Sequence, residues 1–423
     1  MNNISYKSTV YTCYGGNFVQ AIVINLLPIL MIPLRDLYNV TFEQLGRLVF
    51  INFITQVVVD IALSGMIDRY SSRFFLVFGQ ALTGIGLVLF ASVPYLFSNE
   101  NIYLGLAIAT SIYAGGGGLM ELMLSPVVNS LPSDAKAAAM SMLHSFYCWG
   151  QAAVITLTAL GIYFLGYEKW HWIAFMWSVP AFVTMISFMK VPLLPLVSGD
   201  ERTTLRQLIC RKPFWVACLC ICFGAASEVT ISQWISTFSE KGLGLNKMLG
   251  DIGGVALFAV MMALGRTWFG IYGEKVNLHS VMIKMAILAF FCYVTAAVSP
   301  YPSIALIACV LSGLGVCLMW PGTLSLMAAR YPLAGGSMFA ILAASGDIGG
   351  AGGPWGLGYI ADTLSELFKE DGLFGYSGEV LGLRGGLLLS SLFPIGILIS
   401  VLWLRRESLS NKKDEEMKQE CDK

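Results

Sequence analysis

Long apolar blocks of about 20 residues, separated by short polar segments, make up most of this chain. A helix of that length crosses the roughly 30 Å hydrocarbon layer of a membrane. Only 12% of the residues are charged, whereas soluble domains carry about a quarter, so a large soluble core does not explain the blocks. The pattern predicts an all-α protein that crosses the lipid bilayer many times.

The blocks predict twelve spans, at residues 11–33, 44–65, 74–97, 102–128, 139–165, 170–195, 213–238, 250–270, 279–299, 303–329, 336–361 and 384–404. The polar segment between the sixth and seventh spans divides them equally. We therefore expect an N-terminal six-helix bundle over 1–195, a cytoplasmic linker over 196–212, a C-terminal six-helix bundle over 213–404, and a charged tail over 405–423. The tail is too polar to pack, and we expect it to be disordered.

The distribution of basic residues predicts the orientation, because cytoplasmic loops carry an excess of Lys and Arg. With both termini inside, the 26 Lys and Arg residues divide 19 against 7 in favour of the cytoplasmic side. We expect a multi-pass protein of the cell membrane, acting as a monomer.

Other classes of protein find little support. A net charge of zero argues against a nucleic-acid partner. The ten cysteines lie mostly within apolar runs and the three histidines are scattered, so we expect no metal site. No nucleophile and base stand at a catalytic spacing, so we expect no enzyme, no catalytic residue and no organic cofactor.

A short polar hinge is repeated at half the chain length. Ser64-Gly-Met-Ile-Asp68-Arg69 is echoed by Gly270-Ile-Tyr-Gly-Glu274-Lys275, with a small residue followed four places on by an acid and then a base. Nearly the same offset pairs Gln20 with Glu228, and Asp60 with Arg266. Duplicated halves are typical of secondary transporters, in which the substrate site lies between the repeats near the membrane midplane.

The hinge and the twelve spans together resemble the major facilitator superfamily, and the resemblance covers essentially the whole chain. Gly115-Gly-Gly-Gly-Leu-Met-Glu121-Leu-Met-Leu-Ser125-Pro126 is similar to the Gly-rich, Glu-containing helix of the fucose–galactose–glucose permeases. His144-Ser-Phe-Tyr-Cys-Trp-Gly150 is similar to their Asn-Ser-Phe-Gly element. One departure is that Leu26-Leu27-Pro28 has no preceding carboxylate, unlike the sugar–proton members.

Four acids lie within predicted spans, where an ionisable group is costly unless it faces a cavity or a partner: Asp60, Glu121, Glu228 and Asp347. Such a group can load a proton on one side of the membrane and release it on the other. We expect Glu121 and Glu228 to serve proton coupling. The alternative is that both are paired internally and only fix helix packing. For Asp347, a gate residue and a helix cap stay open.

The resemblance implies that the first, fourth, seventh and tenth helices line a central cavity. The expected substrate-binding residues are Gln20, Asn25, Glu121, His144, Glu228, Gln233, Trp234 and Trp320. Gln20 and Asn25 are five residues apart, about 140° around a helix, so one of them can instead hold a neighbouring helix. His144 could equally gate or pack, and Trp320 could be a core aromatic.

The expected gating residues are Asp60, Asp68, Arg69, Arg73, Arg266, Glu274 and Lys275. At the helix ends, charge pairing can latch two helices in one state and release them in another, although the hinges could also be simple positive-inside anchors. Asp60 and Arg266 have opposite charges at equivalent positions, which makes a direct ion pair one option.

These observations favour a secondary active transporter that moves a small polar solute, a sugar first of all, by proton-coupled alternating access. Sodium is an alternative coupling ion, because Gln20, Asn25 and Glu228 could supply oxygen ligands. A proton-driven efflux transporter of drug-like or other metabolites is the first rival function. A non-transporting membrane sensor is the second.

Overall fold

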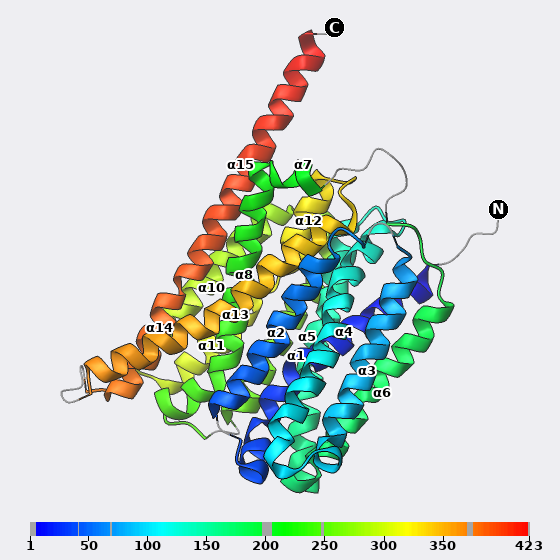
Figure 1. The fold of residues 1–423 in the computed structure, drawn as a ribbon. Coiled ribbons are helices and arrows are strands. Elements are labelled where there is room, and N and C mark those ends of the chain that lie inside the picture. Colours follow the sequence, from blue (N-terminus) through cyan, green and yellow to red (C-terminus); the bar gives the residue numbers. More distant parts are fainter. Residues whose placement is uncertain are drawn as a thin grey trace.

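The computed structural model describes residues 6–40, 42–67, 70–196, 205–246, 249–369 and 375–421. It is an all-α membrane fold (Figure 1). Within the described ranges, eleven helical segments are long and apolar enough to cross a membrane. A further helix, α13 (Gly335–Leu367), covers the span predicted at 336–361 but is not among these eleven; it contains many glycines and Asp347. The prediction of a twelve-helix membrane fold is thus confirmed.

The first six long helices precede the linker. They are α1 (Lys7–Tyr38), α2 (Phe42–Leu63), α3 (Ser72–Leu96), α4 (Ile102–Ser130), α5 (Lys136–Leu165) and α6 (Trp170–Lys190), with short 3-10 turns η1 (Asn99–Asn101) and η2 (Tyr167–Lys169). They pack mainly as α3 against α4 and α6, and α1 against α5.

The second half follows a short linker helix, α7 (Leu205–Ile209). Its helices are α8 (Lys212–Thr237), α9 (Leu257–Tyr272), α10 (Leu278–Val298), α11 (Pro302–Val316), α12 (Met319–Arg330), α13, α14 (Gly378–Ser390) and α15 (Leu392–Cys421). The π-helical turns η3 (Phe238–Gly242) and η4 (Leu249–Ala256) extend α8 and α9, and the 3-10 turn η5 (Gly273–Lys275) follows α9.

Two sequence expectations differ from the structure in their details. The span predicted at 303–329 is broken between α11 and α12, because Pro321 cannot donate a backbone hydrogen bond and its ring displaces the carbonyl of Cys317, four residues earlier. The tail predicted to be disordered after Arg405 continues α15 as a helix to Cys421 (Figure 1). Its Lys, Glu, Gln and Met residues have high helix propensity. The expectation of disorder was based on the charge of the tail and not on this propensity.

Helix α13 approaches α8 closely. A Cβ atom at Gly349 would lie 2.0 Å from the carbonyl oxygen of Cys222, so only glycine fits at this crossing. Small residues of this kind let the backbones of two membrane helices approach each other. The crossing holds α13 at the inner surface of the second half.

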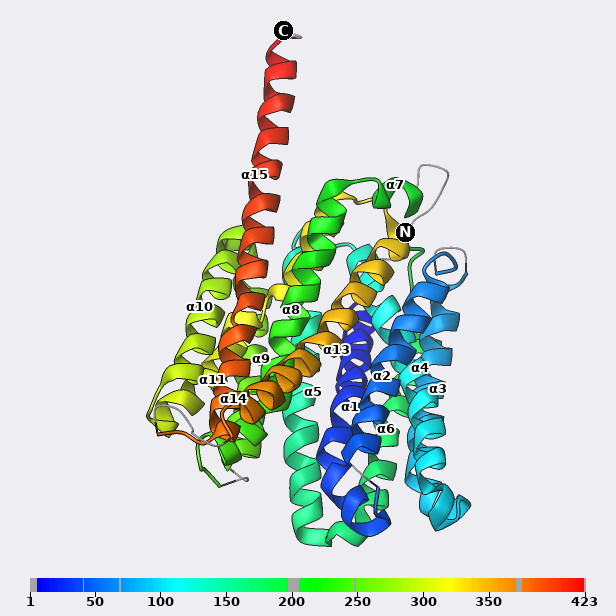
Figure 2. The ribbon, with the colours of Figure 1, turned by 60° about the vertical axis from the view of Figure 1, so that its left-hand side comes forward.

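The two halves contact each other at the end of the bundle where α7 lies, here called the α7 end. There Ser337 of α13 donates a 2.6 Å hydrogen bond to the carbonyl of Ser64, and Ser141 of α5 donates a 2.7 Å bond to the carbonyl of Arg266 in α9. Figures 1 and 2 show α2 and α13 close together at this end and diverging toward the other, here called the distal end. The structure is therefore closed at the α7 end.

Candidate functional site

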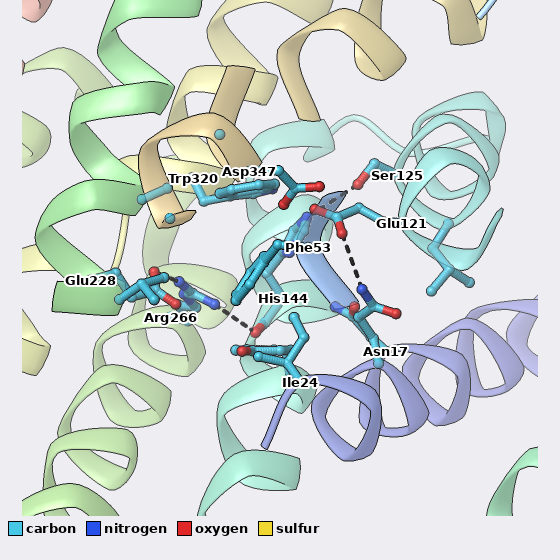
Figure 3. A pocket seen from close by; sticks show the side chains of 17 residues that line it. Asn17, Ile24, Phe53, Glu121, Ser125, His144, Glu228, Arg266, Trp320 and Asp347 are labelled. Carbon is cyan, nitrogen blue, oxygen red and sulfur yellow. Dashed lines mark hydrogen bonds and ion pairs between the residues drawn. The ribbon is translucent and has the colours of Figure 1, made fainter. Parts of the chain in front are cut away.

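A cavity lies between the two halves. Helices α1, α2, α4 and α5 of the first half and α8, α9, α12 and α13 of the second supply its walls. Figure 3 shows Glu228 and Arg266 on one side of the cavity, and Glu121 and Asn17 on the other. Of the eight predicted substrate-binding residues, five line it: Gln20, Glu121, His144, Glu228 and Trp320.

A chain of amide groups ties α1, α2 and α4 together on the first-half wall. The side-chain amide of Gln20 donates to Glu121 Oε2 at 3.0 Å and to Gln56 Oε1 at 2.7 Å. Gln56 in turn donates to Asn52 at 2.8 Å, and Asn52 donates to the carbonyl of Val23. Because each amide is held by the next, the Glu121 carboxylate is fixed at the cavity wall.

The second-half wall contains a buried ion pair. The guanidinium of Arg266, 1% exposed, donates from Nη2 to Glu228 Oε2 at 2.7 Å. Its Nε donates to the carbonyl of Cys317 at 2.7 Å, the carbonyl that Pro321 releases from the helical ladder. Nη1 donates to the carbonyl of His144 at 3.2 Å, across the interface. The helix break at Pro321 thus provides an acceptor for a charge buried beside the cavity.

Residues of α5 complete the wall between the halves. The Nε2 atom of His144 lies 3.1 Å from the hydroxyl of Ser125 on α4. Asn17 of α1 donates to the carbonyl of Leu143 at 2.8 Å. Tyr147 lines the cavity one helical turn beyond His144. A hydroxyl, an imidazole and amides therefore meet at one surface, which can exchange hydrogen bonds with a polar solute.

Aromatic rings cover the cavity from both halves. Trp320 and Phe53 both line it, and Figure 3 shows the Trp320 ring beside the carboxyl group of Asp347. A Cβ atom at Gly346 would lie 2.3 Å from the Trp320 ring, so the glycine provides the space in which the indole lies. An aromatic face of this kind can stack on the apolar face of a ring-shaped solute.

Three residues predicted to bind substrate do not line the cavity. Asn25 bonds to the carbonyl of Ala21 and contacts the hydroxyl of Tyr147 at 3.5 Å, so it supports that residue from behind. Gln233 is exposed, and Trp234 donates to the carbonyl of Pro354 on α13 at 3.1 Å. The reason is rotation around the helix: five and six residues beyond Glu228, both side chains leave its face.

The predicted gating residues are spread over several environments. Arg73 donates to the carbonyls of Phe188, Met189 and Val191 at 2.6 to 2.8 Å, so it caps the end of α6 in its own half. Glu274 is exposed, and the ammonium of Lys275 lies 5.8 Å from the ring centroid of Tyr272. Asp68 and Arg69 lie outside the described residues.

An ion pair between Asp60 and Arg266 is not formed. Arg266 pairs with Glu228, one of the acids expected to carry protons, and Asp60 is fully buried on α2. Arg266 is one of the 19 basic residues that the predicted orientation places on the cytoplasmic side. The structure instead places it at the depth of the cavity, where it neutralises the second-half wall.

Several cavity-lining residues were not predicted as solute contacts, among them Asn17, Phe53, Tyr147 and Asp347. Two of them could have been found by spacing, because Asn17 precedes Gln20 by three residues and Tyr147 follows His144 by three, so each pair shares a helix face. Phe53 had no such signal, since apolar residues surround it in the sequence. No group of three His, Cys, Asp or Glu side chains in the described ranges could hold a metal ion.

Comparison with known proteins agrees with this architecture. The family model of the Major Facilitator Superfamily matches residues 13–354. Comparison with curated protein sequences finds no match.

Solved structures of low sequence identity share the fold. The Escherichia coli fucose:proton symporter FucP superposes with a TM-score of 0.74 at 14% identity, over 95% of this chain and 99% of its own. The proton:xylose symporter XylE, bound to 6-bromo-6-deoxy-D-glucose, has a TM-score of 0.72 at 15% identity, over 92% and 95%. An inward-facing bacterial homologue of the lysosomal transporter Spinster has 0.63 at 16%, over 95% and 96%.

Proposed function

The chain belongs to the Major Facilitator Superfamily, and we propose that it is a proton-coupled symporter that carries a sugar-like polar solute across the cell membrane by alternating access. That it is a multi-pass membrane transporter follows from the family and the fold. The solute class, the coupling ion and the direction are the proposal.

The observation that carries the proposal is the cavity between the halves. Its wall combines amides, a hydroxyl, an imidazole and carboxylates with the rings of Trp320 and Phe53. Polar groups can read the hydroxyls of a sugar while an aromatic face packs on the ring. Two sugar–proton symporters among the solved structures share the fold, which supports the same class of solute.

In the proposed cycle, residues 1–195 and 213–404 rock as two bodies about the cavity. The α7 end faces the cytoplasm, together with the linker 196–212 and both termini, so the structure is closed on the inside. The protein acts as a monomer, because each chain encloses a complete cavity. A solute entering from the distal end would contact both bodies and favour the change of state.

In this proposal, Glu121 and Glu228 both take part in proton coupling, in different ways. Glu121 accepts a hydrogen bond from Gln20 and faces the cavity, so it can exchange a proton and bind a hydroxyl. Glu228 shares its charge with Arg266, and taking up a proton would break that pair. Inward movement of one charge supplies about 2.3 kcal/mol per 100 mV of membrane potential.

Uptake into proteoliposomes tests the proposal. We expect labelled hexoses to accumulate under an inward proton gradient and to stop accumulating when the gradient is collapsed. Glu121→Gln should lose accumulation while keeping exchange of labelled for unlabelled solute. Accumulation that follows a sodium gradient at constant pH would reject the proton as the coupling ion. Absence of both uptake and exchange for every hexose would reject a sugar as the solute.

One observation favours a second function, proton-driven efflux of cationic solutes. Glu121 and Asp347 put two carboxyl groups on the cavity wall from opposite halves, and neither forms an ion pair with a described basic residue. Such a wall suits an amine as well as a hydroxyl. Extrusion of cationic dyes from loaded vesicles, without hexose uptake, would favour this function over symport.

A further inference from the structure

Two buried aspartates from opposite halves have carboxyl oxygens without a hydrogen-bond partner. Asp60 of α2 is fully buried, and neither of its carboxyl oxygens has a partner. Asp347 of α13 is 4% exposed, and its Oδ2 has none. A buried carboxylate without partners is very costly, so these groups require a ligand that removes charge.

The two acids face the contact between α2 and α13. The antiparallel helices are in contact over part of their length. Within this contact, Ser337 bonds to Ser64 at the α7 end, and a Cβ atom at Gly350 would lie 3.8 Å from the ring of Phe53. Asp60 and Asp347 lie between these places on their helices. Side chains lean toward the N-terminus of their own helix, so on antiparallel helices these two lean toward each other, and the charge of Asp347 acts on Asp60.

The surroundings supply further negative charge and no neutralising cation. Glu121 of α4 acts electrostatically on both aspartates. From α8, Glu228 is already neutralised by Arg266, and the thiol of Cys222 is uncharged at neutral pH. Helix α1 contributes the neutral amide of Gln20. Among the described residues, neither aspartate forms an ion pair with a basic side chain.

The aspartates differ in their access to the cavity. Asp347 lines it, whereas Asp60 does not and lies behind it in the contact between the halves. We propose that Asp60 and Asp347 bind one proton between them, and that this proton keeps α2 and α13 together at the α7 end. This inference deepens the proposed function, because it gives the coupling ion a second binding site, at the contact that must open.

The proton transfer is simple. A hydronium ion in the cavity gives its proton to Oδ2 of Asp347 and leaves as water. The new O–H group donates to a carboxylate oxygen of Asp60, so that two carboxyl groups share one proton. When α2 and α13 separate, the proton passes to water on the α7 side. With both carboxylates ionised, their repulsion holds the helices apart.

The chain contains a matched control. The pentapeptide Gly346-Asp347-Ile-Gly-Gly350 recurs as Gly250-Asp-Ile-Gly-Gly254. In the second copy, Asp251 accepts a hydrogen bond from the hydroxyl of Ser236 within the same half. Asp251→Asn changes the same residue in the same local sequence, at a position with a partner and away from α2.

The test measures how far the contact opens as the pH changes. Spin labels are placed on cysteines at Tyr70 and Leu333, two exposed residues flanking the α7 end of the contact. Cys210, which is exposed, and Cys421 are replaced by serine. The distance between the labels is measured in lipid nanodiscs, without solute, over a range from acidic to alkaline pH. The protein without the two added cysteines checks that no other site is labelled.

We expect the distance to lengthen as the pH rises, and to lengthen equally in Asp251→Asn. Asp60→Asn and Asp347→Asn should each keep the short distance at every pH, because an amide cannot ionise. The proposal is overturned if the wild type does not respond to pH, if both variants respond as it does, or if Asp251→Asn loses the response. Since no solute is present, a failure to transport hexoses leaves this result unaffected, and the two proposals can fail separately.

Discussion

Arg266 and Glu228 form a 2.7 Å ion pair at the wall of the cavity, and both come from the second half of the molecule. The other two guanidinium nitrogens of Arg266, Nε and Nη1, donate to the carbonyls of Cys317 and His144. An arginine so fully engaged is poorly placed to attract an anionic solute. The pair therefore makes this wall neutral and leaves Glu121 and Asp347 as the acids that a solute meets.

Replacing one partner of this ion pair should destabilise the protein more than replacing both partners. Arg266→Gln leaves the Glu228 carboxylate, only 13% exposed, without its cation, which costs about 3 to 5 kcal/mol in buried pairs. The double variant Arg266→Gln, Glu228→Gln should recover much of that loss. Thermal unfolding of purified protein measures it, and equal losses in the single and double variants would contradict the expectation.

Gln20→Leu should weaken solute binding. The substitution removes the donor to Glu121 and to Oε1 of Gln56, which costs about 1 to 2 kcal/mol, or a five- to thirty-fold rise in KM. Gln233→Leu is the matched control: it is exposed and lies outside the cavity. Counterflow assays measure the KM of both variants. An equal rise in KM for the two would argue against the cavity as the solute-binding site.

Gly346→Ala should displace the Trp320 ring. The added methyl group would lie 2.3 Å from the indole, and overpacking of this kind costs about 1 to 3 kcal/mol. We expect lower stability, weaker solute binding and a changed tryptophan emission spectrum. Gly352→Ala on the same helix, where a Cβ atom meets nothing within 4 Å, should leave all three unchanged. Equal effects of both substitutions would point to a general property of α13.

Arg73→Ala should destabilise the first half without changing solute affinity. It removes the charged donor that holds three carbonyls at the end of α6, and hydrogen bonds to charged groups contribute about 1.5 to 3 kcal/mol. Arg406→Ala, an exposed arginine on α15, serves as control. Unfolding temperature and KM are read together. A rise in KM with unchanged stability would restore the gating role that the sequence suggested.

The fold could be predicted from the sequence because membrane spans are repetitive and long. Each block must satisfy its backbone within one helix, so its length and hydropathy suffice to find it. Span boundaries were less accurate where a local break intervened, as at Pro321, since a break hardly changes the composition of a block.

The candidate site could be predicted only in part. Gln20, Glu121 and Glu228 were found because polar residues stand out in apolar helices. Their partners were not found, because partners depend on the rotation and depth of each helix. Arg266 illustrates the difficulty: its charge suggested a position near the cytoplasm, and only the packing of α9 against α5 and α11 places it beside Glu228.

The contact at the α7 end is joined by hydroxyl groups and backbone carbonyls, Ser337 with Ser64 and Ser141 with Arg266. The ion pairs formed by described residues each join groups of a single half. A neutral hydrogen bond contributes only about 1 kcal/mol, so these two bonds stabilise the closed state only slightly. The two hydroxyl bonds therefore add little to closure at this end, which depends instead on the apolar side chains that the two halves bury together there and on the charge state of Asp60 and Asp347.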